Sequence, residues 1–283
     1  MIYKNILIPD NFIESMKLYS NIVESKQLKC RNILSENESG QSIFNVVSER
    51  YHEYHNNYKS LENITARTFL EDEKKCLKGC YDITTKGLTK LVKVLESRRN
   101  DVEKSYCYYC GFGEPDTLDH YLPKGEFPEF SVLINNLIPC CSTCNRIKGE
   151  NWIDEKTKYR KLVNFYYDEP EEYQILKCKI EKEDDSFFLS LQLAVDIDSD
   201  NAVQNIIYNH ISTLELITRL ESKSNTYLVG KWKDYQSAVK NGIEDAWRIL
   251  FNEKTKVLKD DFGSNYWKYV INLAIIDSKD FGY

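Results

Sequence analysis

Two short cysteine pairs constrain this chain more than any other feature of its sequence. Cys107 and Cys110 form one Cys-x2-Cys pair, and Cys141 and Cys144 form the other. Two thiolates separated by two residues can bind one ion from a single tight turn, so two such pairs predict a tetrahedral Zn²⁺ site. Four thiolates leave no open coordination position, and the predicted zinc is therefore structural.

The remaining cysteines do not share this spacing. Cys140 adjoins the second pair, but the Cys-x2-Cys spacing favours Cys141 as the ligand and predicts that Cys140 lies in the core. Cys76 and Cys80 are one helical turn apart and are expected to pack in a core. Cys30 and Cys178 show no pairing pattern.

Oxygen and nitrogen ligands stand between and beside the cysteine pairs. They are Asp119, His120, Asn136 and Asn145. An imidazole with an unperturbed pKa of about 6.5 can take a proton from water near neutral pH. Asp119 and Asn145 can supply oxygen ligands to a hard divalent cation. Such a set predicts a hydrolytic centre with one metal ion, because the carboxylates are too few for two.

Asp119-His120, Asn136 and Asn145, framed by two cysteine pairs, resemble the HNH endonucleases, which have the ββα-metal fold. The resemblance implies metal-dependent hydrolysis of phosphodiester bonds in DNA, with His120 as the general base and Asp119 and Asn145 as ligands of Mg²⁺ or Mn²⁺. It implies that Asn136 supports the loop that orients His120. Many HNH centres carry a further histidine where Asn145 stands. The Asn version, which also occurs in the HNH domain of RNA-guided CRISPR nucleases, favours Mg²⁺ or Mn²⁺.

The local sequence fits a small ββα unit. It predicts strand, loop, strand and short helix, over residues 117–121, 121–135, 136–139 and 142–149. Ser142 or Thr143 is expected to cap the helix, and Gly149 to end it.

The whole chain is predicted to be α+β and mostly α-helical. Apolar residues recur at helical spacing on both sides of the cysteine pairs, and alternation predicts a β-hairpin over residues 174–195. We therefore expect three segments: a helical N-terminal region, the zinc-stapled HNH domain, and a hairpin followed by a helical C-terminal region. Their bounds are 1–99, 100–165 and 166–283.

The net charge of −6 argues against a generally basic nucleic-acid binder. Residues 86–161 are slightly basic, and the rest of the chain is acidic. Within that segment, five side chains are candidates for phosphate contact: Arg98, Arg99, Lys124, Arg146 and Lys148. Such a weak local excess predicts that a partner or a bound metal assists binding.

The flanks resemble HNH proteins of bacterial anti-phage systems. The resemblance rests on LDHYLPKGEFPEF, on the hairpin and on GSNYWKYVINLAI. In Septu-type and retron-associated systems the HNH nuclease works with an ATPase, which implies that the helical flanks dock such a partner. The chain contains no G-x4-G-K-[ST] phosphate-binding loop of its own. It has neither a signal-peptide pattern nor an apolar run long enough to span a bilayer, which predicts a cytoplasmic protein without a membrane segment.

Three alternatives stay open. The chain could be a zinc-stabilised nucleic-acid-binding adaptor without activity, a homing or mobile-element endonuclease with its own target site, or a toxin that cleaves tRNA or other RNA. An RNase can use the 2′-OH as an internal nucleophile, so its cleavage would persist without a divalent ion.

Overall fold

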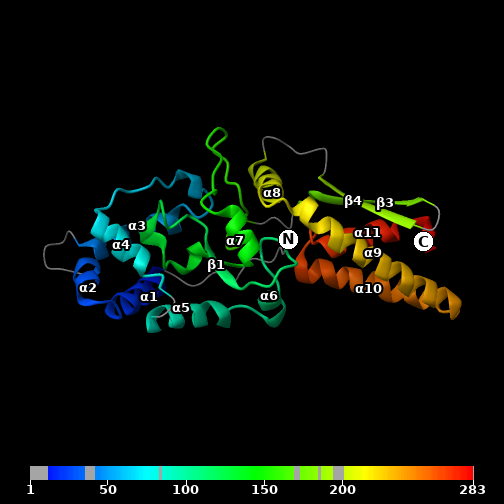
Figure 1. Cartoon of the computed structure of the whole chain (residues 1–283), viewed down its shortest axis with the longest axis horizontal. Coiled ribbons are helices and arrows are strands. Elements are labelled where there is room, and N and C mark those ends of the chain that lie inside the picture. The colour runs from blue at the N-terminus through cyan, green and yellow to red at the C-terminus, as the bar shows by residue number, and fades with distance from the viewer. Residues whose placement is uncertain are drawn as a thin grey trace. The chain divides into compact units, whose positions relative to one another are not determined.

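The computed structural model describes residues 12–35, 42–82, 85–168, 173–183, 186–193 and 201–282. These residues are mostly helical and include two small antiparallel sheets of two strands each (Figure 1). The predicted class, α+β with mostly α-helix, is therefore confirmed. None of the described helices combines the length and the apolarity needed to cross a bilayer.

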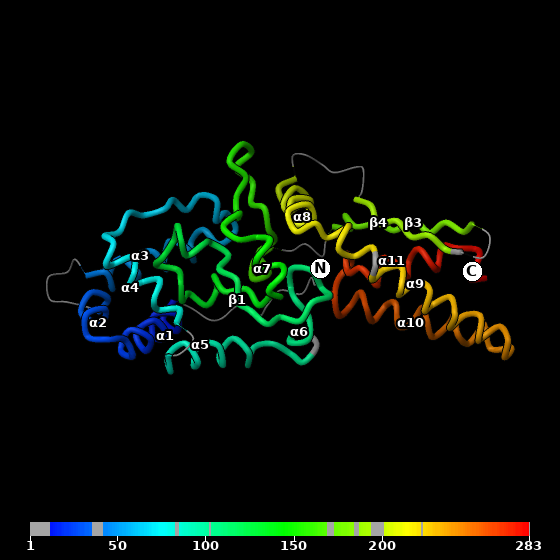
Figure 2. Tube along the Cα trace, in the orientation of Figure 1, coloured from blue at the N-terminus to red at the C-terminus, as the bar shows by residue number. Residues whose placement is uncertain are grey.

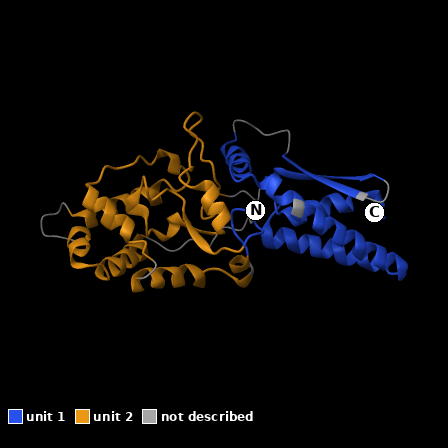
Figure 3. Cartoon of the chain, viewed as in Figure 1, with its two compact units in different colours: residues 1–4, 106–113, 169–283 blue, residues 5–105, 114–168 orange. Residues whose placement is uncertain are grey.

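The described residues divide into two compact units (Figure 3). Unit 1 comprises residues 106–113 and the described residues after 168, and unit 2 comprises the described residues up to 105 together with 114–168. This division differs from the three successive segments predicted from the sequence. The reason is that residues 106–113 pack on the C-terminal helices: the ring of Tyr106 meets that of Phe262 at 5.4 Å.

Unit 2 begins with a series of helices that precede the ββα region in the chain. They are α1 (Phe12–Glu24), α2 (Leu28–Leu34), α3 (Ile43–Asn56), α4 (Glu71–Gly79), α5 (Lys86–Ser97) and α6 (Asp101–Ser105). Helix α5 starts where the Thr85 hydroxyl accepts a hydrogen bond from the Leu88 amide, and it buries Leu88, Leu91 and Leu95. Helix α1 packs against α3 and α5, so this face lies in the core of unit 2.

The ββα unit has the predicted order of elements. Strand β1 (Thr117–His120) pairs antiparallel with β2 (Leu137–Cys140), and α7 (Ser142–Lys148) follows. Asn136 lies in a short 3₁₀ helix, Ile134–Asn136, so the second strand starts one residue later than predicted. The cap of α7 also differs from the prediction, because the Cys141 sulfur accepts the hydrogen bond from the Cys144 amide in place of Ser142 or Thr143. Gly149 ends the helix at a φ of 52°, as predicted.

Unit 1 is built on the predicted hairpin, whose described strands are β3 (Leu176–Glu183) and β4 (Ser186–Leu193). Residues 184, 185, 194 and 195 of the prediction lie outside the described residues. Four helices follow: α8 (Ala202–Thr213), α9 (Leu216–Lys240), α10 (Glu244–Phe262) and α11 (Trp267–Ile276). Helices α11 and α9 pack against β3 and β4, respectively (Figure 2). The Asn265 amide oxygen accepts bonds from the Ile175 and Leu176 amides at 2.6 and 2.8 Å, which fixes the hairpin at the start of α11.

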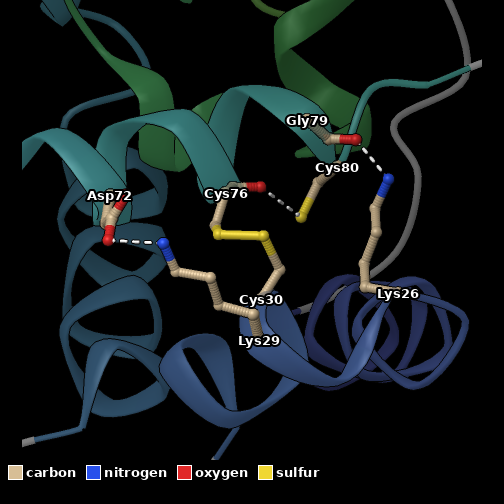
Figure 4. Close-up of a disulfide and its surroundings, with 7 residues drawn as sticks. All are labelled: Lys26, Lys29, Cys30, Asp72, Cys76, Gly79 and Cys80. Carbon is tan, nitrogen blue, oxygen red and sulfur yellow. Dashed lines mark hydrogen bonds and ion pairs between the residues drawn. A yellow bond between two sulfur atoms is a disulfide. The ribbon is translucent and has the colours of Figure 1, made fainter.

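A disulfide joins Cys30 in α2 to Cys76 in α4 (Figure 4). Cys80, one turn further along α4, is buried and donates to the Cys76 carbonyl at 3.4 Å. An ion pair between Lys29 and Asp72, 2.7 Å long, spans the same two helices. The sequence shows no pairing pattern for Cys30, so this bridge was not predicted. The two cysteines are 46 residues apart, and only the packing of α2 on α4 brings them together.

Candidate functional site

The two cysteine pairs meet in one buried cluster. The Sγ atoms of Cys107, Cys110, Cys141 and Cys144 all lie within 4.8 Å of one another. Four converging thiols are the donor set of a structural zinc site, so the group could hold a metal ion such as zinc. Cys140 is outside the cluster, and its sulfur lies 3.5 Å from the Thr117 hydroxyl, which agrees with its predicted place in the core.

Backbone hydrogen bonds shape the two turns of the cluster. In the first turn the Cys107 amide donates to the Gly113 carbonyl at 2.7 Å, and the Gly113 amide donates to the Cys110 sulfur at 3.4 Å. Gly111 has a φ of 72°, which is why a glycine follows the pair. In the second turn the Cys144 amide donates to the Cys141 sulfur at 3.4 Å. Amide donors of this kind stabilise thiolate charge.

Three of the predicted catalytic residues line one cavity in unit 2. Asp119, His120 and Asn145 border a space of about 240 Å³. Asp119 and His120 come from the end of β1, and Asn145 comes from α7. The Asn145 side-chain NH₂ donates to the Thr117 hydroxyl at 3.3 Å, which leaves the amide oxygen as its ligand atom.

His120 is 8% exposed, and one ring nitrogen is engaged. Its Nε2 donates to the Ser131 carbonyl at 2.9 Å, so Nδ1 carries the lone pair of the neutral ring. Burial, together with the Lys124 charge, lowers the pKa of His120 to about 3. The imidazole is therefore neutral at physiological pH and can accept a proton at Nδ1.

Asn136 does not line the cavity, but it braces the chain just after His120. Its side-chain oxygen accepts from the Leu122 amide at 2.8 Å, and its NH₂ donates to the Leu122 carbonyl at 3.0 Å. Its backbone carbonyl accepts from the Tyr121 amide at 2.8 Å. With a fully buried side chain, Asn136 fixes the segment that leaves β1.

Lys148 does not extend into solvent, contrary to the prediction that it contacts phosphate. It is completely buried, and its Nζ donates to Asp119 Oδ1 at 3.0 Å and to the His120 carbonyl at 2.7 Å. A buried ammonium needs such partners, because an unpaired charge in the core is costly. Lys148 thus neutralises Asp119 and holds the end of β1 against α7.

The four remaining candidates for phosphate contact divide into two groups. Arg99 is 4% exposed and pairs with Glu96 at 2.8 Å, so it does not reach solvent as a phosphate contact requires. Arg98 pairs with Glu14 at 2.7 Å and is partly exposed, so its phosphate contact stays a prediction. Arg146 is exposed on α7. Lys124 lines the cavity, with its Nζ 5.0 Å from the centre of the Tyr81 ring.

Two further cavity residues were missed by sequence reasoning. Tyr81, just beyond α4, meets the His120 ring edge-on at 4.4 Å. No local pattern links it to a residue so far along the chain. Glu150 adds a second carboxylate to the cavity and sits directly after the glycine that ends α7, which is a signal that could have found it. A Cβ on Gly125 would meet the Glu150 carboxylate, so only glycine fits there without a shift of Glu150.

Comparisons with known proteins add little to this geometry. No model of a known protein family matches the chain, and no solved structure matches it. A stretch of 40 residues is 48% identical to protein ea31 of Escherichia phage lambda. The match covers 14% of this chain and 14% of the phage protein, so it is local and assigns neither a family nor an activity.

Proposed function

We propose that the protein is an HNH endonuclease that hydrolyses phosphodiester bonds in DNA with the help of one divalent metal ion. The observation that carries the proposal is the convergence of Asp119, His120 and Asn145 on one cavity, in a ββα unit beside four clustered thiols. Each of these groups has a chemical role in such a reaction.

His120 acts as the general base. Its Nε2 bond to Ser131 fixes the tautomer, so Nδ1 can take the proton of the attacking water. The low pKa keeps the ring free of a proton before the reaction, and the charge of a bound phosphate would raise that pKa toward the range useful for catalysis. Asn136 keeps the ring in place by holding the chain at Leu122.

The oxygen donors of the cavity fit a hard cation. Asp119 and Asn145 would hold Mg²⁺ or Mn²⁺, with Glu150 as a further oxygen donor in the same cavity. When bound, the ion stabilises the negative charge that develops on the phosphate and on the leaving oxygen. Because Lys148 neutralises Asp119, we expect the free protein to bind the cation weakly and the substrate phosphate to complete the site.

Nicking of supercoiled plasmid tests the proposal. We expect the wild-type chain to nick DNA in Mg²⁺ or Mn²⁺ and His120→Ala to nick about 10²–10⁴-fold more slowly, with unchanged zinc content and far-UV circular dichroism. His52→Ala is the matched control, because His52 is exposed and stacks on Phe12 away from the cavity. Equal behaviour of His120→Ala and wild type on every substrate would favour the inactive adaptor.

Nuclease assays also distinguish a partner-gated DNase from an RNase and from a homing or mobile-element enzyme. Cleavage of RNA that persists without a divalent ion would indicate an RNase, and cleavage of naked DNA at one defined sequence would indicate a homing or mobile-element enzyme. Nicking that needs a divalent ion and lacks a defined site fits a partner-gated nuclease.

We further propose that the nuclease serves in anti-phage defence with an ATPase partner. What supports a docking surface is a set of exposed apolar side chains on α9, on α10 and in the turn between them. Its members are Val229, Val239, Ile243, Ile249, Leu250 and Val257. Co-purification with an ATPase from the native host would support this role, and loss of co-purification in Ile249→Asp/Val257→Asp would place the contact on these helices. Full activity of the isolated chain would contradict it.

A further inference from the structure

A second cavity, in unit 1, has walls unlike those of the His120 cavity. Its volume is about 490 Å³, within the usual range for small-ligand sites. Aromatic rings and two lysines form most of its wall: Phe112, Tyr227, Tyr266, Trp267, Lys223 and Lys268. No carboxylate lines it among the described residues.

The lysines bring positive charge that acidic groups do not neutralise. Lys223 Nζ lies 5.5 Å from the Phe112 ring centre, and Lys268 Nζ lies 5.3 Å from that of Trp267. Neither lysine forms an ion pair with any residue in the described part of the chain. Arg219 adds a guanidinium 5.3 Å from Phe112. Burial and the nearby Lys231 charge lower the pKa of Lys268, so an anion at this place would relieve like-charge repulsion.

Three of the rings, those of Tyr227, Tyr266 and Trp267, are held by contacts with other side chains. The Tyr227 hydroxyl donates to the Asn272 side chain at 2.9 Å, and its ring meets Trp267 edge-on at 5.6 Å. Tyr266 is stacked on Phe262 at 4.2 Å. The indole N–H of Trp267 is buried and has no hydrogen-bond partner within the described residues.

Flat, rigid aromatic walls favour a planar π system, and two lysines without acidic partners favour an anion. A nucleotide combines both in one molecule. We propose that this cavity binds a nucleotide unit, with its base against the Phe112 and Trp267 rings and its phosphate at Lys223 and Lys268. The unit can belong to single-stranded nucleic acid or to a free nucleotide, since both present the same chemistry. This binding goes beyond the proposed hydrolysis and does not require it.

Fluorescence anisotropy of a fluorescein-labelled ten-nucleotide oligothymidylate tests the proposal, with the full-length zinc-loaded chain and no added divalent ion. We expect Lys223→Gln/Lys268→Gln to weaken binding at least tenfold and to lower the slope of log affinity against log salt by about 0.7 per lysine. Phe112→Leu, which keeps the apolar volume but loses the ring face, should weaken binding about tenfold. Lys233→Gln is the matched control: Lys233 is exposed on α9 and does not line the cavity, so binding should stay within twofold.

Competition identifies the source of the nucleotide. Displacement of the oligonucleotide by AMP, but not by inorganic phosphate, would show that one free nucleotide fills the site. Oligonucleotide binding that AMP does not displace would identify single-stranded nucleic acid as the ligand. The proposal is overturned if neither probe binds, if the double lysine variant binds like wild type, or if Lys124→Gln abolishes binding while the double variant does not. The binding assay contains no added divalent ion and does not measure cleavage, so a failed nicking assay would leave this result standing.

Discussion

His120 in unit 2 and His210 in unit 1 have nearly the same immediate surroundings. Each Nε2 bonds to a backbone carbonyl, that of Ser131 at 2.9 Å and that of Tyr109 at 2.8 Å. Each ring meets a tyrosine ring at a steep angle, Tyr81 at 4.4 Å and Tyr109 at 5.6 Å. Burial lowers the pKa of both histidines to about 3.

The two histidines differ in whether a cavity adjoins them. His120 borders a cavity together with Asp119 and Asn145, whereas His210 is completely buried among the apolar residues of α8. A depressed pKa and a fixed tautomer therefore describe any well-packed histidine. Access to water and to oxygen ligands is the property that makes one of them a candidate base.

We expect the four clustered thiols to hold zinc. Removal of that zinc should have the largest effect, because both histidines depend on the cysteine turns. Tyr109 lies between Cys107 and Cys110, and Lys148, which binds the His120 carbonyl, ends the helix that Cys141 caps. We expect a zinc chelator to lower the free energy of unfolding by about 5 kcal/mol or more. Denaturant melts with parallel zinc analysis measure this.

Cys178→Ser is the control for the metal, because Cys178 lies outside the cluster and should leave both zinc content and stability unchanged. A chain that loses all metal and keeps its melting curve would show that the cluster does not support the fold.

Exchange of the two histidines for alanine should give opposite results. His120→Ala should lose about 10²–10⁴-fold in nicking rate, the usual contribution of a general base, with little change in stability because water can enter its cavity. His210→Ala should keep the rate within twofold but lower the free energy of unfolding by about 2–3 kcal/mol, since it leaves a void and an unpaired Tyr109 carbonyl. Initial rates and urea melts of both variants measure the difference. Loss of activity in His210→Ala at full stability would contradict the comparison.

Lys148→Met tests whether the buried ion pair with Asp119 stabilises the end of β1, where His120 lies. It removes the ammonium from Asp119 and from the His120 carbonyl while keeping most of the buried volume. Loss of one partner of a buried ion pair should cost about 3–5 kcal/mol. Arg146→Met, on the exposed face of the same helix, should change stability by less than about 0.5 kcal/mol. Equal melting of the two variants would mean that the pair contributes nothing.

The disulfide should matter for unit 2. In the chain-entropy description, a bridge across 46 residues stabilises the fold by about 3–4 kcal/mol. It anchors α4, whose end leads to Tyr81 and so to the His120 ring. Cys30→Ala/Cys76→Ala should therefore melt earlier and lower the nicking rate, whereas Cys178→Ala should do neither. A double variant that matches wild type in both measurements would show the bridge to be dispensable.

Local sequence patterns predicted much of this architecture. The spacing of the cysteine pairs predicts the thiol cluster, and the alternation over residues 174–195 predicts the β3–β4 hairpin, because short-range geometry determines both. The motif of Asp119, His120, Asn136 and Asn145 predicts one site, and three of these residues line one cavity. The residues of each feature are close in the sequence or belong to the small ββα unit.

Features that depend on long-range packing could not be predicted in the same way. The Cys30–Cys76 bridge and the Tyr81–His120 contact join residues that no periodicity connects. Lys148 was predicted to be exposed, as a lysine on a short helix usually is. It is buried instead, because its ammonium pairs with the buried Asp119 carboxylate. The position of a buried charged side chain depends on its ion-pair partner, and the sequence alone does not identify that partner.

The pH dependence of stability should show the smallest effect, and it tests the two histidines most selectively. The pKa of His210 is about 3 in the folded chain and about 6.5 when unfolded. The unfolded state therefore binds protons first as the pH falls, so this contribution to stability is complete above pH 6.5 and is lost progressively toward pH 3. Between these two pKa values the free energy of unfolding changes by up to about 1.4 kcal/mol per pH unit.

Urea melts of wild type and His210→Gln at pH 7, 6 and 5 measure this pH dependence, since glutamine keeps a donor for the Tyr109 carbonyl but does not titrate. We expect the variant to lose less stability than wild type over this range. The same exchange at His120 should reduce the slope by a similar amount, because burial lowers the pKa of His120 to about 3 as well. Equal slopes in all three proteins would show that neither histidine is as strongly desolvated as its burial indicates.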